Sequence, residues 1–146
     1  MIDRYTRPRM SAIWDLQHKY EIWLEVELQA CAAFERGGQI PRGTSARIRK
    51  KAKIDVPRIA EIEKVTKHDV IAFLESLMDS VGPEHRFLHM GLTSSDIVDT
   101  SLAVQMTEAL DLILEDLNEL IAVLKKRALE HRHTVMVGRS HGIHGE

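Results

Sequence analysis

The stretch that decides the fold is HMGLTSSDIVDT, residues 89–100, in which residues 91–96 combine a glycine, three hydroxyl side chains and an acid before a long apolar pattern. Apolar residues then recur in alternating steps of three and four, and we call them the apolar seam: Ala103, Met106, Leu110, Ile113, Leu117, Leu120 and Leu124. Because this spacing puts side chains on one face of a helix, the sequence predicts one long helix over residues 95–132.

The first turn of this helix is a candidate anion site. The N–H groups of a first turn have no partners within the helix, and the helix dipole adds positive charge there. The hydroxyls of Thr93 and Ser94 are therefore placed to help hold a carboxylate or a phosphate. The same residues are also typical of an ordinary N-cap, with Thr93 or Ser94 as the cap and Asp96 near the third position. Spacing alone favours the cap, whereas the histidines nearby favour the anion site.

Length and composition exclude several classes of protein. The 146 residues suffice for one modest domain with a core, and a net charge of −2 gives no reason to expect nucleic acid. Cys31 is the only cysteine, so no intrachain disulfide is possible and a reducing, cytoplasmic setting is expected. Residues 1–10 are charged, unlike a secretory signal, and no run approaches the roughly 18 apolar residues of a membrane span.

Shorter helices are predicted before the long one. Their expected ranges are residues 11–36, 44–53, 56–65 and 70–80. Pro8 disfavours helix at Arg7, and Asp55 is a candidate cap for the third helix. The chain therefore reads as all-α: a small helical N-terminal domain, residues 1–92, followed by the start of a central helical bundle, residues 93–146. The short helices cannot bury the whole seam, so we expect partner helices from further chain or from other subunits.

The histidines near helix ends and glycine turns allow three interpretations. They can be exposed or capping residues, or metal ligands in the pairs His131/His133 and His141/His144. A metal is disfavoured because there is no second cysteine and no His-Glu-x-x-His pattern. The third interpretation is acid/base chemistry on an anionic substrate bound at the hydroxyl-lined helix start.

Four blocks of sequence carry a resemblance that favours the third interpretation. They are RYTRPRMSAIW at 4–14, TKHDVIAFL at 66–74, GLTSSDIVDT at 91–100 and GRSHGIHGE at 138–146. In order and interval they resemble the adenylosuccinate lyases, a family of the fumarase/aspartase superfamily of all-α homotetramers. The resemblance implies β-elimination of fumarate from adenylosuccinate, giving AMP, and from the succinylated aminoimidazole carboxamide ribotide of purine synthesis. It implies a small-molecule nucleotide substrate and neither cofactor nor metal.

The resemblance also implies roles for the residues around two histidines. His141 corresponds to the general acid, with His68 as its partner in binding and protonation, and Ser140 lies beside the acid. Lys67 and Asp69 flank His68 as in the family motif. Lys67 stands where arginine is common, which puts a bidentate anion contact in doubt, whereas Ser140 keeps the hydroxyl of the usual threonine.

Further residues are implied to bind the substrate. Arg4 and Tyr5 correspond to a clamp for the substrate phosphate, although from the residues alone this segment reads as a solvated tail. Thr93 and Ser94 correspond to the site of a succinyl carboxylate, and His89 to a support of the pocket.

The family's general base is absent from these 146 residues. It is a serine on a mobile, glycine-rich loop followed by a Met-Pro-x-Lys pattern, and active sites of the superfamily also combine residues of three subunits. We therefore expect this chain to be an N-terminal portion of a homotetrameric lyase and to be inactive alone. The alternatives are another lyase of the superfamily, such as argininosuccinate lyase or a carboxymuconate cycloisomerase, and a non-catalytic helical oligomerisation module.

Overall fold

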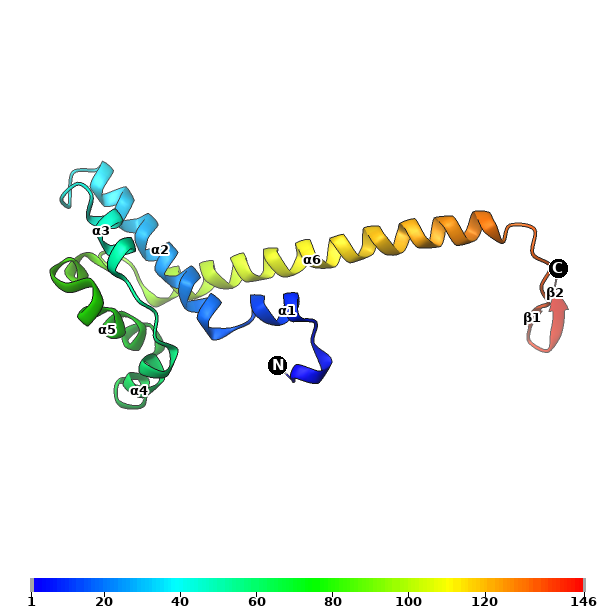
Figure 1. Ribbon diagram of the computed structural model, residues 1–146, viewed down its shortest axis with the longest axis horizontal. Helices are drawn as coiled ribbons and strands as arrows, with labels where there is room; N and C mark the ends of the chain where they lie inside the picture. The colour runs from blue at the N-terminus through cyan, green and yellow to red at the C-terminus, as the bar shows by residue number, and fades with distance from the viewer. Residues whose placement is uncertain (1, 146) are drawn as a thin grey trace. The chain divides into compact units, whose positions relative to one another are not determined.

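The computed structural model describes residues 2–145, which are mostly helical as predicted (Figure 1). The helices are α1 (Pro8–Ile13), α2 (Leu16–Arg36), α3 (Thr44–Lys51), α4 (Val56–Thr66), α5 (Asp69–Val81) and α6 (Ser94–Glu130), with short 3-10 helices η1 (Asp3–Tyr5) and η2 (Gly82–Phe87). The strands β1 (Gly138–Ser140) and β2 (Ile143–Gly145) form a hairpin. No helix in this part of the chain is both long and apolar enough to cross a membrane.

The chain divides into two compact units, Met1–Ala109 and Leu110–Glu146. Helix α6 begins in the first unit and continues into the second. The domain boundary predicted from the sequence, at residues 92 and 93, marks the start of this helix and stays a prediction.

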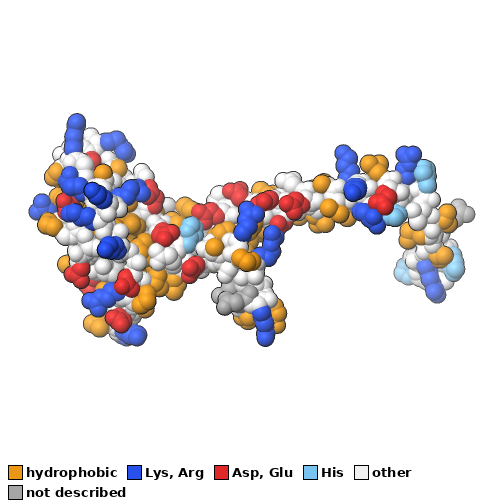
Figure 2. Space-filling model, in the orientation of Figure 1, with side chains coloured by type: hydrophobic (Ala, Val, Ile, Leu, Met, Phe, Trp, Pro, Cys, Tyr) orange, Lys and Arg blue, Asp and Glu red, His pale blue; other side chains and the backbone are white. Residues whose placement is uncertain are grey.

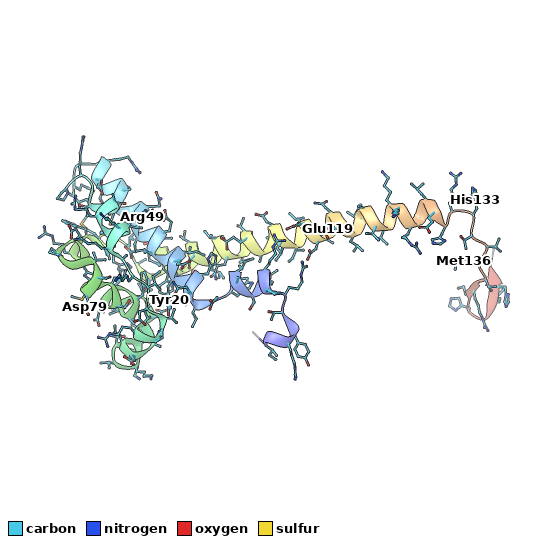
Figure 3. All side chains as sticks on the ribbon, viewed as in Figure 1. Tyr20, Arg49, Asp79, Glu119, His133 and Met136 are labelled. Carbon is cyan, nitrogen blue, oxygen red and sulfur yellow. The ribbon has the colours of Figure 1, made fainter. Side chains whose placement is uncertain are left out.

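The core of the first unit is built around aromatic side chains of α2 and α5. Trp23 and Phe73 are fully buried, with ring centroids 5.5 Å apart in an edge-to-face arrangement. Tyr20, labelled in Figure 3, stacks on Phe73 at 5.8 Å. Such aromatic pairs add about 0.5–1.5 kcal/mol to the free energy gained by burial itself. This cluster fixes α5, and with it the residues at its N-terminus.

The helix predicted over residues 11–36 is in fact two helices, and the prediction of an uninterrupted helix was wrong. Helix α1 begins at Pro8, for which the first turn is favourable, and ends at Ile13. A break at Trp14 and Asp15 follows before α2. The backbone oxygen of Ile13 accepts a 2.6 Å hydrogen bond from the Gln105 side chain of α6, which supplies the freed carbonyl with a partner.

Helix α4 begins as predicted. The Asp55 carboxylate accepts a 3.0 Å hydrogen bond from the backbone N–H of Arg58, and Pro57 occupies the first turn. One free N–H of the helix end is thereby satisfied, which explains why the helix starts at Val56.

The first unit uses a different face of α6 from the one that the apolar seam marks. Ile97, Ser101 and Gln105 are buried there, and Trp23 Nε1 donates a 2.8 Å hydrogen bond to Ser101 Oγ. Large seam residues stay exposed in the chain, with exposed fractions from 44% to 57%: Met106, Leu110, Ile113, Leu117, Leu120 and Leu124. Figure 2 shows hydrophobic side chains on the surface along this helix. The seam is thus available to helices other than those of the first unit.

Residues 138–145 of the second unit form a hairpin. Strands β1 and β2 pair antiparallel, with Ser140 opposite Ile143. The two residues between them, His141 and Gly142, have φ values of 50° and 81°. Positive φ at both central positions is the signature of the type I′ turn that closes two-residue hairpins. His141 therefore occupies the tip of a defined turn.

Candidate active site

His68 is placed by the sharp turn between α4 and α5. Lys67 ends α4 in the left-handed conformation, with φ of 54°, and its N–H donates a 2.9 Å hydrogen bond to the Glu63 carbonyl. His68 follows as the N-cap of α5, where its Nδ1 accepts from the backbone N–H of Ile71 at 3.4 Å. An accepting Nδ1 carries no proton, so in this state the proton is on Nε2.

The start of α6 meets this histidine. Ser94 Oγ lies 3.4 Å from His68 Nε2, which joins two of the predicted site residues across 26 positions of sequence. Both belong to helix N-termini, where unpaired N–H groups and the helix dipole favour an anion. With 41% of the His68 side chain exposed, the pair is accessible. This is the geometry that the anion-site interpretation requires.

Asp69 gives His68 a second partner. Its Oδ1 lies 3.6 Å from His68 Nδ1 and accepts a 2.7 Å hydrogen bond from the N–H of Val70. When Nδ1 is unprotonated it accepts from Ile71, and when it is protonated it faces a carboxylate. Nδ1 of His68 therefore has a partner whether or not it carries a proton. Such an arrangement suits a general acid or base, which must be stable in both protonation states.

The start of α6 shows one half of the N-cap expected for residues 93–96. Asp96 Oδ2 accepts a 2.8 Å hydrogen bond from the backbone N–H of Thr93, the half of a capping box in which the third residue reaches back. The Ser94 hydroxyl lies against His68. The role of Thr93 and Ser94 in binding an anion stays a prediction.

His89 is held by a residue that the sequence analysis missed. Both Glu27 carboxylate oxygens contact it: Oε2 accepts from the His89 N–H at 2.6 Å, and Oε1 lies 2.7 Å from His89 Nδ1. Glu27 is fully buried in α2. The signal in the sequence was its position four residues from both Trp23 and Cys31, on the buried face of the helix, where a carboxylate needs a partner.

Gly91 completes the turn from His89 to α6. Its φ is 71°, a conformation that side chains other than glycine rarely adopt. A Cβ at this position would stand 3.4 Å from the Phe34 ring. The turn at Gly91 directs the chain into the first turn of α6.

Arg4 and Tyr5 contact each other. The Arg4 guanidinium lies 4.8 Å from the centre of the Tyr5 ring, and Tyr5 is 73% exposed. In the part of the chain that the structure describes, no hydrogen bond or ion pair joins either residue to His68 or Ser94. Their role as a phosphate clamp stays a prediction.

Ser140 and His141 belong to the hairpin of the second unit, and both are exposed. His141 shares an unusual feature with two predicted site residues of the first unit. Within residues 2–145, the only non-glycine residues with positive φ are Lys67, His89 and His141. Such conformations cost on the order of 1–3 kcal/mol and concentrate at functional sites.

Cys31 is unsuited to act as a nucleophile. Burial raises the pKa of this thiol to about 11, and the nearby Glu27 and Glu35 carboxylates add to the effect. Its Sγ contacts the Phe87 carbonyl at 3.2 Å. The thiol is therefore protonated at neutral pH and lacks the reactive thiolate form.

Comparison with known proteins shows the family to which the chain belongs. The sequence model of a lyase family, Lyase_1, matches residues 3–146. The chain belongs to this lyase family. Its relatives include the adenylosuccinate lyases of Bacillus subtilis (strain 168), 47% identical, and Synechocystis sp. (strain ATCC 27184 / PCC 6803 / Kazusa), 51% identical. Each match covers 100% of this chain and 34% of the relative, so the chain spans about a third of their length.

Solved structures share the fold. The 3-carboxy-cis,cis-muconate lactonizing enzyme from Pseudomonas putida matches 99% of this chain and 35% of its own, with a TM-score of 0.87 and 30% identity. A fumarate lyase from Mesorhizobium sp. BNC1 matches 92% of this chain and 33% of its own, with a TM-score of 0.84 and 27% identity. The helical fold predicted from the sequence is confirmed by these matches.

Proposed function

We propose that the whole protein that carries this lyase-family chain is an adenylosuccinate lyase. It cleaves adenylosuccinate to fumarate and AMP, and it performs the same elimination on the succinylated aminoimidazole carboxamide ribotide. The choice of substrate is supported by 46–51% identity to adenylosuccinate lyases over the full length of the chain. The observation that carries the chemistry is the contact of His68 Nε2 with Ser94 Oγ at the start of α6.

In this proposal the first turn of α6 binds a succinyl carboxylate through its N–H groups and the hydroxyls of Thr93 and Ser94. A base that we expect outside this chain removes the proton beside the other carboxylate and leaves a carbanion. The carbanion's electron pair becomes the double bond of fumarate as the carbon–nitrogen bond breaks. His141 donates a proton to the departing nitrogen, and His68 assists in binding and protonation.

The other predicted residues bind the nucleotide part or support the site. Arg4 and Tyr5 hold the phosphate by charge-assisted and O–H hydrogen bonds. Lys67 and Asp69 flank His68, and Ser140 lies next to His141. The proposal needs no cofactor or metal.

Assembly is part of the proposal, because the first unit lacks helices to cover the apolar seam. The exposed seam residues of α6 are suited to pack in a bundle with further helices of the same subunit and of others. We infer a cytoplasmic homotetramer in which the chain described here is inactive by itself.

The test is a spectrophotometric assay of the whole protein with adenylosuccinate and, separately, argininosuccinate. We expect fumarate release from adenylosuccinate alone. Turnover of argininosuccinate without turnover of adenylosuccinate would overturn the assignment in favour of another lyase of the superfamily.

The fold likeness to the muconate lactonizing enzyme makes a cycloisomerase the second candidate. It is the weaker one, because its 30% identity is well below the 47–51% shared with two adenylosuccinate lyases. Formation of a lactone from carboxymuconate by the whole protein, without adenylosuccinate cleavage, is the result that would favour it.

A further inference from the structure

Glu27 is a fully buried carboxylate that the proposed chemistry does not use. It belongs to α2, is fully buried, and lies among the apolar side chains of the core. Burying a carboxylate costs several kcal/mol unless hydrogen bonds compensate for the lost water. An apolar side chain at this position would avoid that cost. The reason for a carboxylate here must therefore lie in the residue that it contacts.

That partner is a single residue, His89, contacted at both its backbone and its ring. The 2.6 Å bond from the backbone N–H fixes the loop, and the 2.7 Å contact at Nδ1 fixes the plane of the ring. His89 itself is held in the left-handed conformation, with φ of 57°. An ordinary buried ion pair does not require this strained backbone, whereas a precisely aimed ring does.

The contact also decides which ring nitrogen carries a proton. An ionised carboxylate only accepts hydrogen bonds, so Nδ1 must be the donor. Within residues 2–145 no hydrogen bond reaches the other nitrogen, Nε2, and 23% of the side chain is exposed. Nε2 is therefore the atom that His89 can offer to a substrate, as an acceptor when the ring is neutral.

We propose that Glu27 is a positioning residue of the elimination reaction, acting through His89. It aims the ring and fixes its tautomer, in the way that a buried carboxylate orients the histidine of a catalytic triad. The same bond to the backbone of His89 anchors the turn that leads through Gly91 into α6. This inference rests on the proposed function, in which His89 supports the substrate pocket.

The substitution Glu27→Gln tests the role with little change in shape. The introduced amide oxygen can still accept from the His89 N–H, but the amide NH2 group then faces Nδ1. Nδ1 must now accept a hydrogen bond, so the ring proton moves to Nε2. Nε2 then donates a hydrogen bond to the substrate, whereas in the parent protein it accepts one. Partners that orient metal-binding histidines are typically worth about 10–100-fold, and we take the same scale for His89. We expect kcat of the whole protein to fall by about that factor, with KM changed by less than about threefold.

The decisive measurement is a double-mutant cycle with His89→Gln in the whole protein, assayed with adenylosuccinate. If Glu27 acts through His89, the double variant has the same kcat as His89→Gln alone, because the second change removes nothing further. The proposal would be overturned if the fold losses in kcat of the two single variants multiplied in the double variant. An unchanged kcat in the Glu27→Gln variant would overturn it as well. The control is Glu35→Gln, which removes another helix α2 carboxylate that accepts from the N–H groups of Gly43 and Ser45 and should leave kcat unchanged.

Two further arms keep the inference testable. If Glu27→Gln does not fold, Glu27→Asp replaces it in the cycle, since it keeps the charge and withdraws the carboxylate by one methylene. If the parent protein does not cleave adenylosuccinate, the proposed function fails, and crystal structures of the whole parent and Glu27→Ala proteins test the positioning separately. Because alanine has no atom to hold Nδ1, we expect the His89 ring to turn away from its orientation in the parent, and an unmoved ring would overturn the inference.

Discussion

His68 combines a structural and a chemical role, and the two can be separated by choice of substitution. Asparagine is a good N-cap and preserves the start of α5, whereas alanine removes the cap as well as the imidazole. We expect both His68→Asn and His68→Ala to lower turnover of adenylosuccinate by about 100-fold or more, the scale of lost acid/base assistance. Only His68→Ala should also lose about 0.5–2 kcal/mol of stability, measured by thermal melting.

One result with the two His68 variants would contradict a chemical role for His68. If His68→Asn kept full turnover while His68→Ala lost it together with stability, the residue would be a cap and nothing more. That result would remove His68 from the chemistry and leave only the start of α6 as a substrate site.

Helices α2 and α6 are joined by the buried hydrogen bond from Trp23 to Ser101. The substitution Ser101→Ala leaves the Trp23 N–H without a partner, which costs about 1–3 kcal/mol for a buried donor. We expect a corresponding fall in the denaturation midpoint of the whole protein. Ser76→Ala is the control, because Ser76 Oγ bonds only the Phe73 carbonyl of its own helix and should be nearly neutral. Equal effects of the two changes would contradict the claim.

Helix α3 is tied to η2 by Glu84, and this contact depends on pH. Lys51, at 3.1 Å, and Arg47, at 3.0 Å, contact the carboxylate and hold the pKa of Glu84 below its ordinary value. A lowered folded-state pKa gives stability that is complete above the unfolded-state value, about 4.3, and is lost as pH falls through the folded-state value. Glu84→Gln should therefore lower the melting temperature at pH 7, with a difference from the parent that shrinks in acid. A difference that stayed constant down to pH 3 would show that charge is not the cause.

Elements were predictable where a local signal decides them. Asp55 capped α4 as expected, and the long helix ended within two residues of its predicted bounds. The break after Ile13 was not predictable, because its carbonyl is satisfied by Gln105, which lies 92 positions later. Glu27 was missed for a related reason: a glutamate in a helix reads as surface until the partner that permits its burial, 62 positions away, is known.

The candidate site divides in the same way. His68 and Ser94 were named from the family resemblance, and the structure places both at helix starts, which sequence marks well; their roles stay predictions. The pairing of His68 with Ser94 needed the packing of α5 beside the start of α6. The turn at His141 was readable in principle, since histidine is among the residues enriched at positive φ and glycine follows it.

At the scale of the whole molecule, the exposed seam on α6 predicts assembly. Leu117 and Leu120 are 46% and 52% exposed, so burying the rest of each side chain between subunits contributes about half of the 1.5–3 kcal/mol of a full burial. Leu117→Glu places a charge in the proposed interface, so we expect the proposed tetramer to dissociate and the whole protein to lose turnover, since in the proposal the active sites depend on assembly. Asn118→Glu introduces the same side chain at the next exposed position, off the seam, and should change neither. Light scattering after size-exclusion chromatography distinguishes the states. A tetramer that survives Leu117→Glu with full activity would mean that the seam is covered within one subunit or remains in water.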